Sequence, residues 1–147
     1  MDQTEQITLK FRVGSTNYTV PLGLRILFDQ QTILETPRVN HEIEIEHTFS
    51  DDDGEHELAI ELFGKTAEHT KIDQAGEIVS DSVLTVDGIE IDAIDLNFLF
   101  QQLATYTHDF NGTQALTEQK FFGALGCNGV VKFKFTTPVY LWFLENM

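Results

Sequence analysis

The stretch that decides the fold is His41–Gly64, which reads HEIEIEHTFSDDDGEHELAIELFG. Apolar and polar residues alternate on both sides of Asp53-Gly54, and alternation with a period of two is typical of half-buried β-strands. Because Asp-Gly tolerates the positive φ angles of a type I′ turn, the stretch predicts one antiparallel hairpin. In that register Glu46 lies opposite Glu61, and two facing like charges need solvent, a cation or a basic partner nearby.

The same register gives the hairpin one buried face and one acidic face. The buried face is predicted to hold Ile43, Ile45, Phe49, Leu58, Ile60 and Leu62, with the imidazole of His47 among them.

Three further turn signals divide the rest of the chain, at Asp87-Gly88, Asn111-Gly112 and Asn128-Gly129. The first predicts a hairpin of residues 83–86 with 89–92. The last predicts a hairpin of residues 121–127 with 130–135, in which Phe122 faces Phe135. Residues 32–39 are expected to form a loop, because they contain Pro37.

Two segments favour helix. In Ile94–Tyr106 apolar residues fall at helical spacing, although an alternating strand also fits, and Thr137-Pro138 suits the start of a terminal helix. We therefore predict an all-β fold, an antiparallel and jelly-roll-like β-sandwich with one or two short helices, formed as a single domain by residues 1–147.

Charge is concentrated in the middle of the sequence. Residues 41–95 hold 17 acidic side chains and 2 lysines, and 2 − 17 gives the whole net charge of −15. Such a field repels phosphate, so we expect no nucleic-acid partner. A solvated acidic surface and a site for a divalent cation both fit this segment.

Composition indicates a soluble globular protein. The sequence is 41% hydrophobic, and it contains neither a signal-peptide pattern nor an apolar run of membrane-spanning length, so we expect no membrane span. The single Cys127 excludes an internal disulfide.

The acidic tip of the predicted hairpin is a candidate calcium site. Carboxylate oxygens are the ligands that Ca²⁺ prefers, and an ordinary exposed turn is the alternative. The candidate metal ligands are Asp51, Asp52, Asp53 and Glu55.

A second cluster surrounds His108-Asp109, where an imidazole and a carboxylate stand next to each other. No serine or cysteine nucleophile accompanies them in a recognisable motif, so we expect a hydrogen-bonded corner or a binding site and no enzyme. The candidate binding residues are Tyr106, His108, Asp109 and Asn111.

The C-terminal run from Tyr140 to Leu144 is apolar on every side. It is therefore expected to be buried, either in the core of its own chain or against another copy of the chain. Tyr140, Trp142 and Phe143 are the candidate interface residues.

Several stretches resemble small β-rich structural proteins of tailed marine phages. They are ELAIELFGKTAEHTKID (57–73), IVSDSVLTVDGIEIDAIDL (78–96), HDFNGT (108–113), FFGALGCNG (121–129) and TPVYLWFLENM (137–147). The resemblance implies an accessory piece of the head, neck, tail or fibre that works as a symmetric multimer.

A strand ending in Leu62-Phe63-Gly64, followed by Asp81 before VLTVDGI, is similar to calcium-dependent carbohydrate-binding β-sandwich modules. That resemblance implies a glycan ligand and a calcium loop.

The sequence therefore predicts a non-enzymatic virion structural or accessory protein, made in the host cytoplasm, whose partners are other copies of itself and other virion proteins. The alternative is a calcium-dependent carbohydrate-binding module that attaches to a host-surface glycan. No cofactor is expected other than calcium in that alternative.

Overall fold

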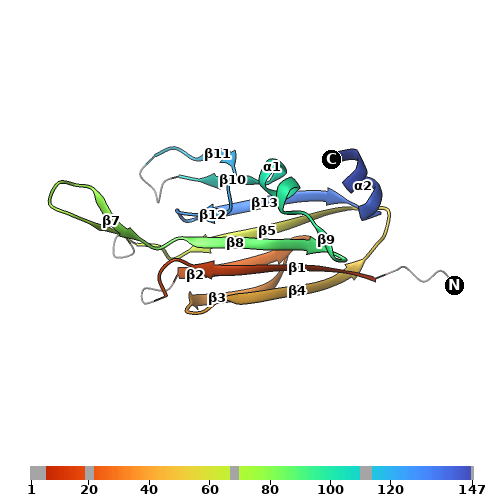
Figure 1. The fold of residues 1–147 in the computed structure, drawn as a ribbon, viewed down its shortest axis with the longest axis horizontal. Helices are drawn as coiled ribbons and strands as arrows, with labels where there is room; N and C mark the ends of the chain where they lie inside the picture. The colour runs from red at the N-terminus through yellow and green to blue at the C-terminus, as the bar shows by residue number, and fades with distance from the viewer. Residues whose placement is uncertain (1–5, 19–21, 67–69, 110–113, 147) are drawn as a thin grey trace.

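The protein is a sandwich of two antiparallel sheets (Figure 1). The computed structural model describes residues 6–18, 22–66, 70–109 and 114–146. The first sheet has the order β12 (Ala124–Leu125), β8 (Leu84–Ile91), β1 (Gln6–Ser15) and β4 (Ile43–Ser50), and β9 (Ile94–Asp95) also pairs with β8. The second sheet has the order β11 (Thr117–Lys120), β10 (Thr105–His108), β13 (Gly129–Thr136), β5 (Glu55–Phe63), β2 (Leu22–Phe28) and β3 (Gln31–Val39). The predicted all-β sandwich is confirmed.

Three smaller elements complete the fold. The hairpin of β6 (Thr70–Ile72) and β7 (Ile78–Asp81) projects beyond the sandwich at the left of Figure 1. The helices α1 (Asn97–Leu103) and α2 (Val139–Asn146) both contact β13. In the part of the chain that the structure describes, no helix is long and apolar enough to cross a membrane.

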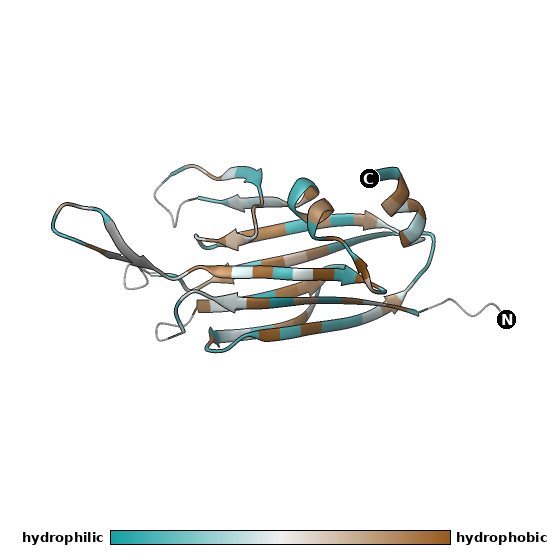
Figure 2. Cartoon of the chain, in the orientation of Figure 1, coloured by the Kyte–Doolittle hydropathy of each residue, from teal (hydrophilic) through white to brown (hydrophobic). Residues whose placement is uncertain are grey.

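The core lies between the two sheets, where the apolar side chains of facing strands meet. Hydrophobic and hydrophilic residues alternate along these strands (Figure 2). Burying these side chains is the main favourable term in folding, at about 25 cal/mol for each Å² of apolar surface. The largest fully buried side chains are Phe11, Phe121, Phe133, Phe135, Ile7, Leu9, Leu22, Leu24, Ile26, Leu58, Ile60 and Leu62.

The predicted hairpin over residues 41–64 is wrong. β4 pairs with β1 in the first sheet, whereas β5 pairs with β13 and β2 in the second, so the turn at Asp53-Gly54 carries the chain from one sheet to the other. Alternation predicts correctly that the apolar residues face the core, but it does not say whether two strands are neighbours in one sheet or face each other across the core.

This crossing also removes the predicted clash of like charges. Glu46 of β4 is paired with Lys10 of β1, and Glu61 of β5 is paired with Arg25 of β2. Each glutamate therefore has a cationic neighbour in its own sheet.

The predicted hairpin at Asp87-Gly88 is also wrong. β8 runs straight through it with a bulge, since Lys10 pairs with Glu90 and Arg12 with Asp87, which leaves one extra residue on β8. Gly88 has a φ of +68°, a conformation that glycine adopts without steric cost.

The tight turns with two positive φ angles lie elsewhere. Asp29-Gln30 joins β2 to β3 with φ values of 50° and 69°, and Asp92-Ala93 joins β8 to β9 with φ values of 49° and 66°. Neither turn contains glycine, so the dipeptide signal missed both.

Two other strand predictions differ from the structure. β12 pairs with β8, so Phe122 does not face Phe135 in a hairpin. Residues 31–39 form the edge strand β3 despite Pro37, because an edge strand has one side where an N–H is not needed. The turn at Asn111-Gly112 lies outside the described residues.

Both predicted helices are present, and the first is shorter than expected. In α1 the buried residues are Leu99 and Phe100, whereas Leu103 is 41% exposed. The residue at the N-cap position is Leu96, whose side chain makes no capping bond, and the side chain of Asp95 just before it accepts the Asn97 N–H at 2.9 Å.

Candidate functional site

A cleft with an exposed aromatic ring at its rim lies where β10, β11 and β12 meet. It has a volume of about 260 Å³ and combines aromatic with polar side chains, as small-molecule sites do. We name it the Phe122 cleft. Its lining residues are Tyr106, His108, Gln119, Lys120, Phe122, Ala124, Gly126 and Cys127.

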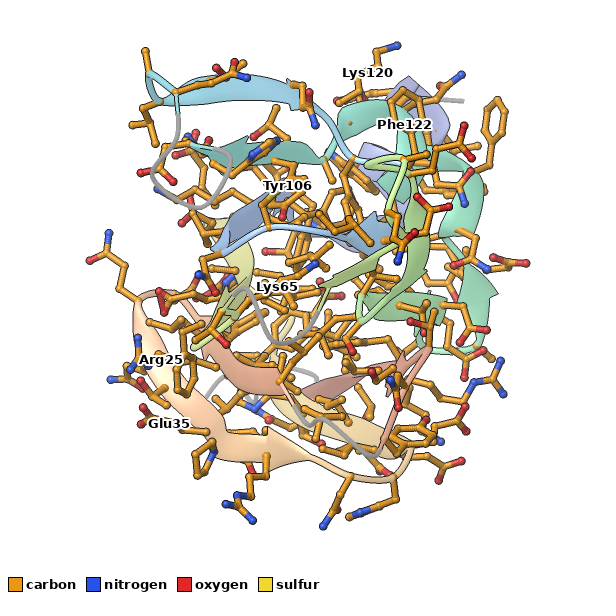
Figure 3. The ribbon with its side chains drawn as sticks, turned by 90° about the vertical axis from the view of Figure 1, so that its left-hand side faces the viewer. Arg25, Glu35, Lys65, Tyr106, Lys120 and Phe122 are labelled. Atoms are coloured by element: carbon orange, nitrogen blue, oxygen red, sulfur yellow. The ribbon has the colours of Figure 1, made fainter. Side chains whose placement is uncertain are left out.

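Phe122 stands in solvent because its neighbour Phe121 is anchored in the core. Phe121 is fully buried, its ring meets Phe100 edge to face at 5.5 Å between centroids, and its N–H donates to the Ala104 carbonyl at 3.2 Å. Successive side chains of an extended segment point in opposite directions. Lys120 and Phe122 therefore point outward, as Figure 3 shows, and 78% of Phe122 is exposed.

Tyr106 fixes the opposite wall of the Phe122 cleft. Its side chain is 4% exposed, and its hydroxyl accepts the Cys127 N–H at 2.9 Å and donates to the Cys127 carbonyl. Burial raises the pKa of Tyr106 to about 12, because the charged phenolate loses its hydration there. Both hydrogen bonds hold the segment before β13 against β10.

Close backbone contact keeps this wall in place. A Cβ on Gly129 would lie 2.4 Å from the Thr107 carbonyl oxygen, so only glycine fits at the first residue of β13. His108 is 3% exposed, and its Nε2 atom lies 3.0 Å from the amide nitrogen of Gln119. The floor of the cleft is therefore polar and ordered.

A buried lysine lies directly behind the cleft. Lys65 is 6% exposed, and its Nζ donates to the carbonyl of Gly126, a lining residue, at 2.5 Å. The Lys65 N–H donates to Asn128 Oδ1 at 2.8 Å, and Asn128 Nδ2 donates back to the Lys65 carbonyl at 2.9 Å. Figure 3 shows Lys65 below Tyr106 at this end of the sandwich.

The structure brings together two of the four predicted binding residues. Tyr106 and His108 both line the Phe122 cleft, Asp109 is half-buried just beyond β10, and Asn111 lies outside the described residues. Sequence reasoning missed Lys120 and Phe122. The signal was available, because two adjacent aromatic residues in an extended segment cannot both face one core.

No family model matches the sequence, and no curated protein matches it. One solved structure that the chain resembles is vCBM60 in complex with galactobiose. The TM-score is 0.49 and the sequence identity is 12%, over 86% of this chain and 96% of that chain. The function proposed for this chain therefore rests on its own residues.

The predicted calcium ligands lie at the crossing between the sheets, where Asp52 already has protein partners. Its Oδ1 lies 3.0 Å from His56 Nε2 and accepts a hydrogen bond from Thr137 Oγ1 at 3.0 Å. The Thr137 bond, followed by that of His56, lowers the pKa of Asp52. In the described residues no three acidic, histidine or cysteine side chains are placed to hold a metal ion together, and calcium binding at Asp51, Asp52, Asp53 and Glu55 stays a prediction.

A larger cleft lies beside this crossing, and we name it the His56 cleft. Its volume is about 630 Å³, and three carboxylates line it, from Asp29, Glu55 and Glu57. His56 Nδ1 lies 2.7 Å from Asp29 Oδ2, so the imidazole joins the β2–β3 turn to Asp52. Since Thr137 also bonds Asp52, this network joins the β2–β3 turn, the crossing between β4 and β5, and the segment between β13 and α2.

The candidate interface residues separate into exposed and buried side chains. Tyr140 is 60% exposed, whereas Trp142 is 6% exposed and packs edge to face on Phe133 at 5.7 Å between centroids. Phe143 is half-buried against the core. Trp142 therefore belongs to the core of its own chain, and Tyr140 stays a predicted interface residue.

Proposed function

We propose that this protein is a non-catalytic module that binds carbohydrate at the Phe122 cleft. The observation that carries the proposal is the exposed ring of Phe122 at the rim of a cleft whose floor holds hydrogen-bonding groups. A pyranose ring has an apolar C–H face and a rim of hydroxyls, so it matches an aromatic surface flanked by an amide and an ammonium.

The rigidity of the cleft supports the same proposal. Tyr106 and Gly129 hold the wall by hydrogen bonds and close backbone contact, so little ordering is required when a ligand binds. Lys120 and Gln119 are exposed on β11 and supply donors beside the ring.

The test is binding to a glycan array with millimolar calcium and with EDTA, followed by titration calorimetry on each glycan that binds. We expect Phe122→Ala to weaken binding at least about fivefold, since stacking on an aromatic side chain contributes about 1 kcal/mol or more. Phe98→Ala is the matched control, because Phe98 is 69% exposed on α1 and lies outside the cleft. A blank array, or equal binding by both variants, would overturn the proposal.

A second candidate function is a structural one, as a subunit of a virion that contacts other copies of the chain and other virion proteins. It is favoured by three exposed side chains on α2, because Tyr140, Leu141 and Leu144 are each at least 58% exposed. Sedimentation velocity over a wide range of concentration tests it. Multimers that Leu144→Ser dissociates support this function, and a monomer at every concentration counts against it.

A further inference from the structure

The Phe122 cleft differs in charge from two larger clefts of the described structure. The His56 cleft is lined by three carboxylates and Lys134. A cleft of about 540 Å³ on the first sheet is lined by Glu44, Glu46 and Glu90 together with Lys10 and Arg12, so in each of these clefts the carboxylates outnumber the cations. Among the described residues no carboxylate lines the Phe122 cleft, and the lining includes the cationic side chain of Lys120. In a protein with a net charge of −15 this reversal marks the cleft as a place for an anion.

Lys120 gives the cleft its cationic side chain. It stands at the rim next to Phe122, on the outward side of the buried Phe121. Lys65 lies behind the wall, where its Nζ bonds the Gly126 carbonyl at 2.5 Å and so holds a lining residue in place.

Most acids of the sequence lie outside the segment that lines the cleft. Residues 41–95 hold 17 of the 24 acids, whereas residues 96–147, which supply every lining residue named above, hold three acids and three lysines. Asp109 and Glu118 are the acids nearest to the lining residues along the chain, and neither is one of them.

We infer that the ligand of the Phe122 cleft is a glycan that carries a carboxylate, that is, a uronate-containing sugar. The ring of Phe122 would stack on the apolar face of the pyranose, while Lys120 donates to the carboxylate and Gln119 to a ring hydroxyl. A charge-assisted hydrogen bond to a carboxylate is roughly twice as strong as a neutral one, so Lys120 sets the preference for uronate over neutral sugar.

This inference rests on the proposed function, since it names the ligand of the same cleft. The experiment compares oligogalacturonate with a neutral galacto-oligosaccharide of equal length, by calorimetry in EDTA at about 0.15 M NaCl, where surface charges are still felt. We expect the uronate to bind up to about fivefold more tightly, the size of effect that one ion pair to an exposed lysine produces.

The variants separate the two contributions. Lys120→Gln should weaken the uronate more than the neutral sugar and so remove the preference between them, whereas Phe122→Ala should weaken both ligands by a similar factor. Lys134→Gln is the control, because Lys134 is 79% exposed and lines the His56 cleft at the other end of β13.

Raising the NaCl concentration gives a further readout. The preference for uronate should shrink as salt rises, because it depends on charge, and the effect of Phe122→Ala should not.

The two proposals fail in different ways. If the protein binds the neutral sugar and the uronate with equal affinity, or if Lys120→Gln keeps the preference for uronate, the inference about uronate is overturned while glycan binding stands. If neither sugar binds and the wider array is also blank, the proposed function falls together with the inference.

Discussion

Replacing Tyr106 by phenylalanine should destabilise the protein at neutral pH and should flatten its loss of stability in alkali. The substitution keeps the ring in the core but removes the hydroxyl that bonds both the N–H and the carbonyl of Cys127. Depriving two buried backbone groups of that partner costs about 1–3 kcal/mol.

The pH dependence follows from the pKa of Tyr106, which is raised from about 10 to about 12 in the folded protein. Folding favours the neutral phenol, so this contribution is complete below pH 10 and is lost as the pH rises through 12. A shift of about two pKa units corresponds to at most about 2.7 kcal/mol of the free energy of unfolding. That is a large part of the 5–15 kcal/mol typical of a domain.

The assay is urea unfolding followed by the fluorescence of the buried Trp142, repeated from pH 8 to pH 11.5. Tyr106→Phe should be less stable than the wild type at pH 8. The difference in the free energy of unfolding between the two proteins should shrink above pH 10, because only the wild type has a phenol to ionise at position 106. Tyr140→Phe is the control, since Tyr140 is 60% exposed and should change the free energy of unfolding by less than about 0.5 kcal/mol. No difference at pH 8, or a difference that stays constant with pH, would refute this account of Tyr106.

Three further predictions concern other parts of the molecule. Gly129→Ala should destabilise by about 1–3 kcal/mol in urea unfolding, because its Cβ would lie 2.4 Å from the Thr107 carbonyl oxygen; unchanged stability would show that the strands can separate there. Arg25→Ala should lower the free energy of unfolding slightly in the same assay, because Arg25 bonds the carboxylates of Glu35 and Glu61, and the loss should diminish in high salt. If the carboxylates of residues 51–55 bind calcium, a concentration of about 100 Kd should raise Tm by roughly 5–10 °C over NaCl of equal ionic strength, and equal melting in both salts would exclude a site there.

Alternation predicted which side chains face the core, and the structure shows why it could not predict the pairing of strands. Ile45 of β4 and Ile60 of β5 are both buried, as expected, but they lie in different sheets. A strand that faces another across the core has the same pattern as a strand beside it. The predicted opposition of Glu46 and Glu61 was the physical sign of the error, because folding removes such a clash by giving each carboxylate a cation.

Turn chemistry was informative about where the chain bends and misleading about how. Gly88 supplies a positive φ, yet it serves a bulge within β8, whereas Ala93 adopts a φ of 66° in a true two-residue turn. The left-handed conformation costs a residue such as alanine roughly 1–2 kcal/mol, so no local rule predicts it there. The pairing of β8 with β9 must supply that energy, and pairing is not visible in a dipeptide.

The candidate site was half predictable for a related reason. The sequence drew attention to Tyr106 and His108 because they lie in the cluster around the adjacent imidazole and carboxylate of His108-Asp109, and both line the cleft. The exposed ring at the rim of the cleft comes from the pair Phe121-Phe122, since one ring of such a pair must point away from the core of a sandwich. Which ring leaves is decided by the hydrogen bond from the Phe121 N–H to the Ala104 carbonyl, a contact between segments that no pattern within residues 117–125 specifies. An exposed aromatic residue of this kind becomes predictable only after the register of its neighbours is known.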